Sequence, residues 1–129
     1  MKEIRSFNPP GVPQPIAPYS TVTTFGDLVF LAGHLAIDLD GKPLAHLSAG
    51  EQTAKAMDYM SVALRGAESD LKNVLKVTIY VSSIEDFAEI NRVYETYFPS
   101  RRPSRATVEV SRLIGDLKVE IDAIAVRSA

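Results

Sequence analysis

The sequence has 129 residues, of which 46% are hydrophobic and 23% charged, and its formal net charge is −2 at neutral pH. This length and balance are typical of one globular domain over residues 1–129, and the slight acidity disfavours a nucleic-acid partner. The chain has no cysteine, which excludes disulfides, thiolate metal sites and thiol nucleophiles. It contains no apolar leader and no run long enough to span a bilayer, so we expect a cytoplasmic protein without a membrane partner.

The first third of the chain predicts an arm followed by a hairpin. Residues 1–18 hold five of the eight prolines, which indicates an extended arm laid over the surface. The runs 21–25 and 28–31 are rich in strand-forming residues, and a Gly-Asp pair between them supplies a two-residue turn. Ala32 and Gly33 interrupt the second strand, which predicts a bulge or a close approach of the backbone to another group.

The middle of the chain predicts two helices with a strand between them. Ser48 and Glu51 have the spacing of a capping box, and apolar residues at three- and four-residue steps favour a helix over 49–67. Alternation over 74–82 predicts a strand, after which Ser83 is placed to cap a second helix. The buried stripe of that helix is expected to consist of Phe87, Ile90, Tyr94 and Tyr97.

Two final strands, at about 106–111 and 117–127, are separated by a short loop, which predicts a second hairpin. The order hairpin, helix, strand, helix, hairpin indicates an α+β fold with two helices packed on one face of a single sheet. No further helix remains to cover the other face. That deficit predicts self-association.

The register of the predicted last hairpin decides where Arg105 lies. In the favoured register its side chain shares one polar face with Glu120, because a slip of one residue would place the charge in an apolar layer. Two explanations of this charge remain open from the pattern alone. It is either an exposed cross-strand ion pair or a clamp that binds a planar anion through two parallel N–H bonds, with Glu120 holding or activating a water.

The segment 102–126, RPSRATVEVSRLIGDLKVEIDAIAV, resembles the C-terminal signature of the RidA (YjgF) family. The stretches APYS, LAGHLAID and VLKVTIYVSSIEDFAEINRVYETYF are also similar to the family, and the resemblance extends over about residues 8–127. It implies a chorismate mutase-like α+β fold with a mixed sheet. It also implies a homotrimer with a ligand cleft at each subunit interface.

The same resemblance implies an activity. Family members with this arginine hydrolyse reactive enamines and imines of the 2-aminoacrylate type to 2-keto acids and ammonia, and they need no cofactor and no metal. Carried over by position, Arg105 clamps the carboxylate of the 2-imino or 2-keto acid, and Glu120 orients the hydrolytic water. Asn91 matches a recurrent helix position, for which we expect a packing or capping role. The residues expected to contact the ligand are Tyr19, Ala32, Gly33, His34, Arg105 and Thr107.

Three of these positions depart from the common pattern. Ala32 stands where many deaminating members carry serine or threonine, His34 replaces a common glutamine, and Thr107 replaces a frequent cysteine. Because these side chains would face the ligand, the changes bear on which substrate is taken. The alternatives are a non-catalytic module that binds small carboxylates, a deaminase of another substrate such as 2-aminomuconate, and a ribonuclease, which the acidic balance disfavours.

Overall fold

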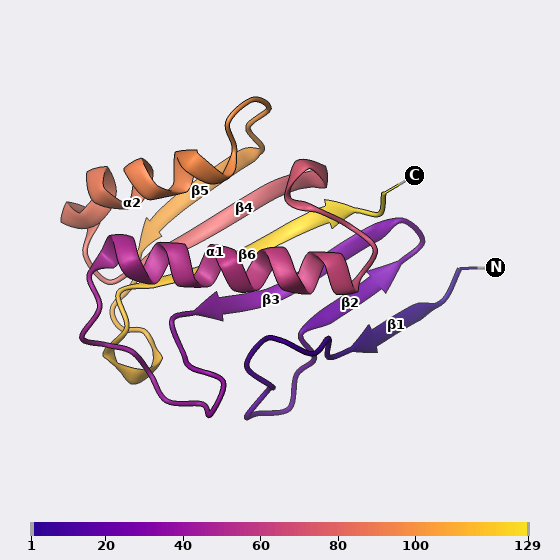
Figure 1. Cartoon of the computed structure of the whole chain (residues 1–129), viewed down its shortest axis with the longest axis horizontal. Coiled ribbons are helices and arrows are strands. Elements are labelled where there is room, and N and C mark those ends of the chain that lie inside the picture. Colours follow the sequence, from indigo (N-terminus) through magenta and orange to yellow (C-terminus); the bar gives the residue numbers. More distant parts are fainter. Residues whose placement is uncertain (1, 129) are drawn as a thin grey trace.

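The computed structural model describes residues 2–128 and has two layers, a six-stranded sheet and a pair of helices (Figure 1). The strand order is β1-β2-β3-β6-β4-β5, and all neighbours are antiparallel except β4 and β5, which run parallel. The expected α+β class, with a mixed sheet and both helices on one face, is confirmed. The strands are β1 (Ile4–Phe7), β2 (Val22–Phe25), β3 (Leu28–Leu35), β4 (Val74–Val81), β5 (Ser104–Glu109) and β6 (Val119–Val126).

Helix α1 (Ala49–Gly66) begins at the predicted capping box. The Glu51 amide donates to Ser48 Oγ at 3.1 Å, and the Ser48 amide donates to Glu51 Oε1 at 2.9 Å. This reciprocal pair satisfies two amide groups that the first helical turn would otherwise leave free. The buried stripe of α1 packs on β3 and β6, and its largest fully buried side chains are Met57, Met60 and Leu64.

The predicted hairpin of β2 and β3 is confirmed. Phe25 pairs with Leu28, and Gly26 between them has a φ of 61°, in the left-handed region that favours glycine. The predicted bulge is also present, because the pairing of β3 with β6 shifts between Leu31 and His34. The bulge re-aims the end of β3, which is the part of the strand that reaches the candidate site.

Strand β1 lies inside the segment predicted as an extended arm over residues 1–18. It pairs with β2 from Ile4 to Phe7 and forms one edge of the sheet. All five prolines of the segment follow β1, since the first of them is Pro9. The prediction of an extended arm from the prolines therefore applies only to the residues after the strand. That later part lies against α1, because Pro9 is next to Gly66 and Gly11 is next to Val62, and Val12 is buried.

The predicted last hairpin is wrong. Strands β5 and β6 do not pair, because β4 lies between them and hydrogen-bonds to both. The chain from β4 to β5 passes through helix α2 (Phe87–Tyr94), and a helical crossover of this length returns a strand parallel to its neighbour. Strand β6 then enters antiparallel between β3 and β4 as a central strand (Figure 1).

Helix α2 is shorter than its apolar stripe predicts. Ser83 Oγ accepts from the Glu85 amide at 3.3 Å and so caps a single 3₁₀ turn, after which the α-helix begins at Phe87. Within the stripe Ile90 and Tyr94 are buried as expected, whereas Phe87 is 42% exposed. The ring of Phe87 lies outside the core and packs near Arg105.

The face of the sheet away from the helices is open among residues 2–128, as the count of helices predicted (Figure 1). Large apolar side chains remain exposed there, including Phe25, Leu28, Phe30 and Val108. A folded monomer in water seldom leaves such a set of side chains on one face without a partner. Self-association through this face remains our prediction.

Candidate active site

Arg105 lies near the start of β5, the edge strand, and its side chain is on the helix side of the sheet. Its Nη2 donates to Asn91 Oδ1 at 2.7 Å, and its guanidinium carbon is 4.8 Å from the centre of the Tyr94 ring and 5.5 Å from that of Phe87. These distances are typical of cation–π contacts. Helix α2 therefore fixes the position of the half-buried guanidinium group without neutralising its charge.

Two buried hydroxyl groups near this arginine have no hydrogen-bond partner among the described residues. They are Thr107 Oγ1 and Tyr94 Oη. Thr107 is two positions beyond Arg105 on the same face of β5, and the Tyr94 ring packs against the guanidinium. Burial raises the pKa of Tyr94, with Arg105 opposing that change, so the hydroxyl group keeps its proton at neutral pH. Both hydroxyls therefore lie buried without the hydrogen-bond partner that such groups usually have.

Glu120 lies on β6, where its neighbours are Leu35 on β3 and Tyr80 on β4. Its carboxylate packs directly against Gly33, so that a Cβ atom at position 33 would overlap it. Burial, together with the nearby charge of Asp122, raises the pKa of Glu120 above that of an ordinary glutamate. The bulge glycine therefore makes room for a carboxylate that binds a proton more readily than usual.

The structure corrects the predicted polar face. Arg105 pairs with Val77, which is buried beneath the helices, whereas Glu120 alternates with the buried Val119 and Ile121 and so lies on the open face. The guanidinium and the Glu120 carboxylate are on opposite faces of the sheet in one chain. Arg105 thus lies on the apolar face that the sequence analysis disfavoured. The charge is stable there because β5 is an edge strand, where α2 supplies the arginine with an amide and two rings.

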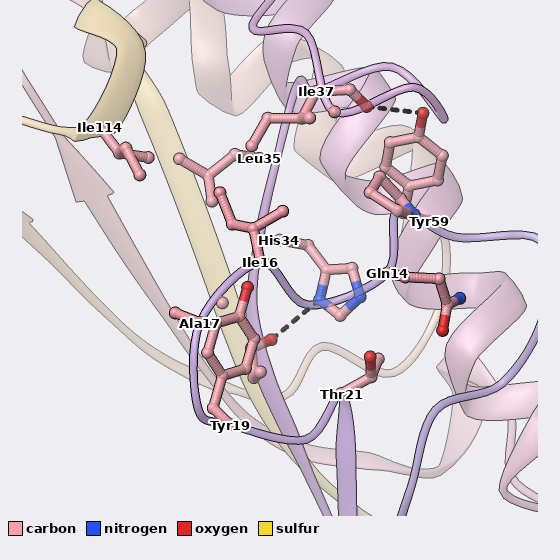
Figure 2. Close-up of a pocket in the computed structure, with 14 residues that line it drawn as sticks. Gln14, Ile16, Ala17, Tyr19, Thr21, His34, Leu35, Ile37, Tyr59 and Ile114 are labelled. Atoms are coloured by element: carbon pink, nitrogen blue, oxygen red, sulfur yellow. Dashed lines mark hydrogen bonds between the residues drawn. The ribbon is translucent and has the colours of Figure 1, made fainter.

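Four of the predicted ligand contacts gather around one pocket of about 190 Å³ (Figure 2). The pocket lies between the segment that precedes β2 and the bulged end of β3. Its lining includes Tyr19, Ala32, Gly33 and His34, but not Arg105 or Thr107. The predicted contacts therefore form two groups in one chain, one around Arg105 and the other around this pocket.

His34 is the deeply buried polar residue of the pocket. The residue is 6% exposed, and its ring points into the pocket between Tyr19 and Gln14 (Figure 2). Nδ1 is 2.8 Å from the Ala32 carbonyl oxygen, which only accepts hydrogen bonds, so Nδ1 carries a proton. Burial lowers the pKa of His34, against a smaller opposing effect of this hydrogen bond, and the ring is neutral at pH 7. Its Nε2 atom is then an acceptor.

Sequence reasoning missed the set of residues that positions Arg105. Asn91 was expected to pack or cap, yet its amide oxygen accepts the arginine's hydrogen bond, and Phe87 and Tyr94 were assigned to the core stripe. The three residues are spaced by four and three positions, so they share one side of α2. The spacing of these three residues was the available clue, because it places an amide and two rings on one side of a helix near an arginine that needs a polar partner.

The described part of the chain has neither a cluster of metal-binding side chains nor a membrane-spanning helix. Within residues 2–128, no three side chains of the histidine, cysteine, aspartate or glutamate type come together in a way that could hold a metal ion. None of the helices in that range combines the length and the apolar character needed to cross a bilayer.

The fold and the residues around Arg105 define a protein of the YjgF type. Residues 11–127 match the family model described as Endoribonuclease L-PSP, and the chain belongs to this family, the RidA (YjgF) family. The E. coli YjgF gene product has a similar structure, with a TM-score of 0.88 at 29% identity over 96% of this chain and 99% of that one. E. coli TdcF with bound serine gives a TM-score of 0.84 at 30% identity, over 91% and 94% of the two chains.

Sequence relatives differ in how specifically they are named. A RutC family protein of Pyrococcus abyssi is 39% identical over 113 residues, which are 88% of this chain and 89% of that protein. The human 2-iminobutanoate/2-iminopropanoate deaminase is 30% identical over 115 residues, covering 89% of this chain and 84% of the human protein. The family is thus established, and the more specific name occurs at the lower identity.

Proposed function

We propose that this protein hydrolyses small reactive enamines and imines of the 2-aminoacrylate type to 2-keto acids and ammonia in the cytoplasm. The observation that carries the proposal is the Arg105 guanidinium, which α2 holds in place while its charge stays uncompensated. Deaminase names among the relatives support the same chemistry.

Arg105 would bind the substrate carboxylate. Asn91 accepts one hydrogen bond from the five N–H groups of the guanidinium, and the remaining donors suit the two oxygens of a carboxylate. Fixing the acid end sets the imine carbon in one place, which is the proximity contribution to catalysis.

Glu120 would act as the base. Its raised pKa makes the ionised carboxylate a better proton acceptor than an ordinary glutamate. The carboxylate takes a proton from water as the water oxygen bonds to the imine carbon. That proton returns to the nitrogen, which gives a carbinolamine. The carboxylate then takes the proton of the carbinolamine hydroxyl and passes it to the amino nitrogen, so that the C–N bond breaks as the C=O bond forms, and ammonia and the 2-keto acid leave. No group outside the chain is needed to balance this hydrolysis.

A site that uses both residues requires two subunits. Arg105 and Glu120 lie on opposite faces of the sheet in one chain, so one small ligand cannot contact both. We propose a homotrimer in which Arg105 of one subunit meets Glu120, Gly33 and Tyr19 of its neighbour. The exposed apolar side chains of the open face would be buried in the same assembly.

The activity is tested with a threonine or serine dehydratase as the imine source, by following the appearance of the 2-keto acid. We expect faster formation with the protein, no acceleration with Arg105→Ala, and little with Arg105→Lys, because lysine lacks the planar fork. Absence of acceleration with the wild-type protein contradicts the proposal. If a 2-keto acid nevertheless binds in an Arg105-dependent way, the alternative of a non-catalytic carboxylate-binding module is favoured.

The shared site is tested by mixing two inactive variants. Arg105→Ala and Glu120→Gln subunits are unfolded together and refolded at equal amounts, so that subunits combine at random. About one quarter of the sites then contain an intact Arg105 and an intact Glu120 from two different chains. We expect about that fraction of wild-type activity to return. A mixture as inactive as its components would place both residues of a site in one chain and refute the shared cleft.

A further inference from the structure

We propose that the pocket lined by His34 receives the side chain of the substrate, and that the protein prefers 2-imino acids with a bulky, mainly apolar side chain over the three- and four-carbon compounds. The proposal rests on the function proposed above and adds the substrate class. Its first support is position: Gly33 lines the pocket and also contacts the Glu120 carboxylate. The pocket therefore adjoins the place where the imine carbon would react.

The size of the pocket suits a side chain larger than methyl or ethyl. Its volume is about 190 Å³, and an apolar cavity of about 150 Å³ is large enough for benzene. A branched four-carbon chain or a phenyl ring would occupy it, whereas a methyl group would leave most of it unfilled. Because each methylene that a ligand buries adds to its binding, unfilled volume corresponds to lost affinity.

The lining has the character of a side-chain pocket. Ile16, Leu35, Ile37 and Ile114 contribute apolar surface (Figure 2), and Ile16 and Ile114 remain 71% and 57% exposed. These side chains come from three separate segments, which together surround one space. Ala32 adds another apolar wall. A ligand that covers these side chains removes their surface from water.

His34 supplies the second, independent indication of a ligand. Its ring is almost fully buried and turned into the pocket, with Nδ1 engaged by Ala32. The hydrogen bonds of the described residues include none at Nε2. A neutral imidazole edge tolerates an apolar neighbour and accepts a hydrogen bond from a hydroxyl group. A charged side chain would find no counter-ion among the lining residues, so the class excludes acidic and basic side chains.

The test compares side chains with the reaction held constant. An L-amino-acid oxidase generates the imines of alanine, leucine and phenylalanine, and a nucleophilic trap for free imine reports how much the protein hydrolyses first. We expect the leucine and phenylalanine imines to exceed the alanine imine in kcat/KM by at least about tenfold. Equal values for the three, or a preference for the alanine imine, overturn the inference while leaving the proposed function standing.

A pocket-filling variant isolates the side-chain site. Ala17→Phe places a ring at an exposed lining position and leaves Arg105 and Glu120 untouched. It should abolish the preference for bulky imines, with kcat/KM for the leucine and phenylalanine imines falling at least about tenfold. Glu3→Phe adds the same ring at an exposed position outside the pocket and should change neither. A preference that survives in Ala17→Phe refutes the assigned pocket.

Binding of stable products separates failure of the inference from failure of the proposed function. Calorimetry with 4-methyl-2-oxopentanoate, phenylpyruvate and pyruvate requires no turnover. We expect the two larger keto acids to bind at least about tenfold more tightly than pyruvate, and this ratio to disappear in Ala17→Phe. If no imine is hydrolysed but the ratio is observed, the proposed function fails and the pocket assignment stands. Equal affinities overturn the pocket assignment.

Discussion

Replacing Gly33 by alanine tests the contact between the bulge of β3 and the carboxylate of Glu120. A Cβ atom at this position would overlap Glu120 Oε2 and come within 2.8 Å of Cδ and 3.0 Å of Cγ. Non-bonded carbon atoms pack at about 3.5–4.0 Å, so the side chain must move by roughly 1 Å. Gly33 is not in the left-handed region, and its backbone therefore accepts alanine. The perturbation is confined to one crowded side chain.

The expected change in stability follows from two opposing effects. Overpacking of this kind costs about 1–3 kcal/mol, and a glycine-to-alanine change at a compatible position stabilises by about 0.4–1 kcal/mol through the unfolded chain. We expect Gly33→Ala to lower the free energy of unfolding by about 1–2 kcal/mol. In a Glu120→Ala background the three crowded atoms are gone, and the same substitution should be neutral or stabilising.

The assay is urea unfolding of the four proteins of this double-mutant cycle, all at one protein concentration because association would shift the midpoint. Equal m-values would show that the comparison concerns stability alone. An equal loss of stability in both backgrounds would refute the reasoning, because the strain would then not involve Glu120. On the proposed function, Gly33→Ala should also lower kcat/KM by about a hundredfold, since a shift of 1 Å misplaces the base.

Three further predictions concern protonation and the arginine. Asn91→Asp would hold Arg105 in an ion pair and so compete with the carboxylate of a ligand. Calorimetry should show affinity for 2-oxobutanoate reduced at least about tenfold, with no loss of protein stability. Unchanged affinity would contradict binding of the ligand carboxylate by Arg105. The acidic limb of the kcat/KM profile should lie above the pH of an ordinary glutamate, because the raised pKa of Glu120 keeps the base protonated to higher pH; a limb at the ordinary value contradicts this role. Burial lowers the pKa of His34, so below about pH 6.5 the histidine binds a proton in the unfolded chain but not in the folded one, and the free energy of unfolding falls as the pH is lowered. His34→Gln should flatten this pH dependence. An identical slope of unfolding free energy against pH in the variant would show that His34 does not cause it.

The features predicted correctly from the sequence are those whose causes lie within a few residues. Ser48 and Glu51 specify the start of α1 because both partners of the capping box are three positions apart. The Gly-Asp turn specifies the hairpin of β2 and β3 for the same reason. The bulge followed from Gly33, although its function as the contact for Glu120 depends on β6, which is distant in sequence.

The error in the last hairpin has a different origin. Alternation of apolar and polar residues specifies which side chains share a face along one strand, but it does not identify the neighbouring strand. Strand β6 alternates between buried and half-buried residues along its whole length, as a central strand does, and β5 does not. The helix between β4 and β5 was the stronger guide, since such crossovers join parallel strands. Arg105 misleads the pairing because the side chains that stabilise its charge among apolar neighbours lie on α2, and the pattern of β5 and β6 does not reveal them.

The corrected topology changes what the two charged residues imply. Had β5 and β6 formed a hairpin, Arg105 and Glu120 would have compensated each other across neighbouring strands, and an exposed ion pair would have explained both. Because β4 lies between β5 and β6 and the two side chains lie on opposite faces of the sheet, neither residue compensates the charge of the other. The arginine keeps its charge on an edge strand, and the glutamate keeps a raised pKa beside a glycine that leaves it room. On the proposed function both states suit a ligand, and a single chain presents the two residues on opposite faces of the sheet. A second copy of the chain is the simplest partner able to bring them to one ligand, and the open sheet face offers the apolar surface for that contact.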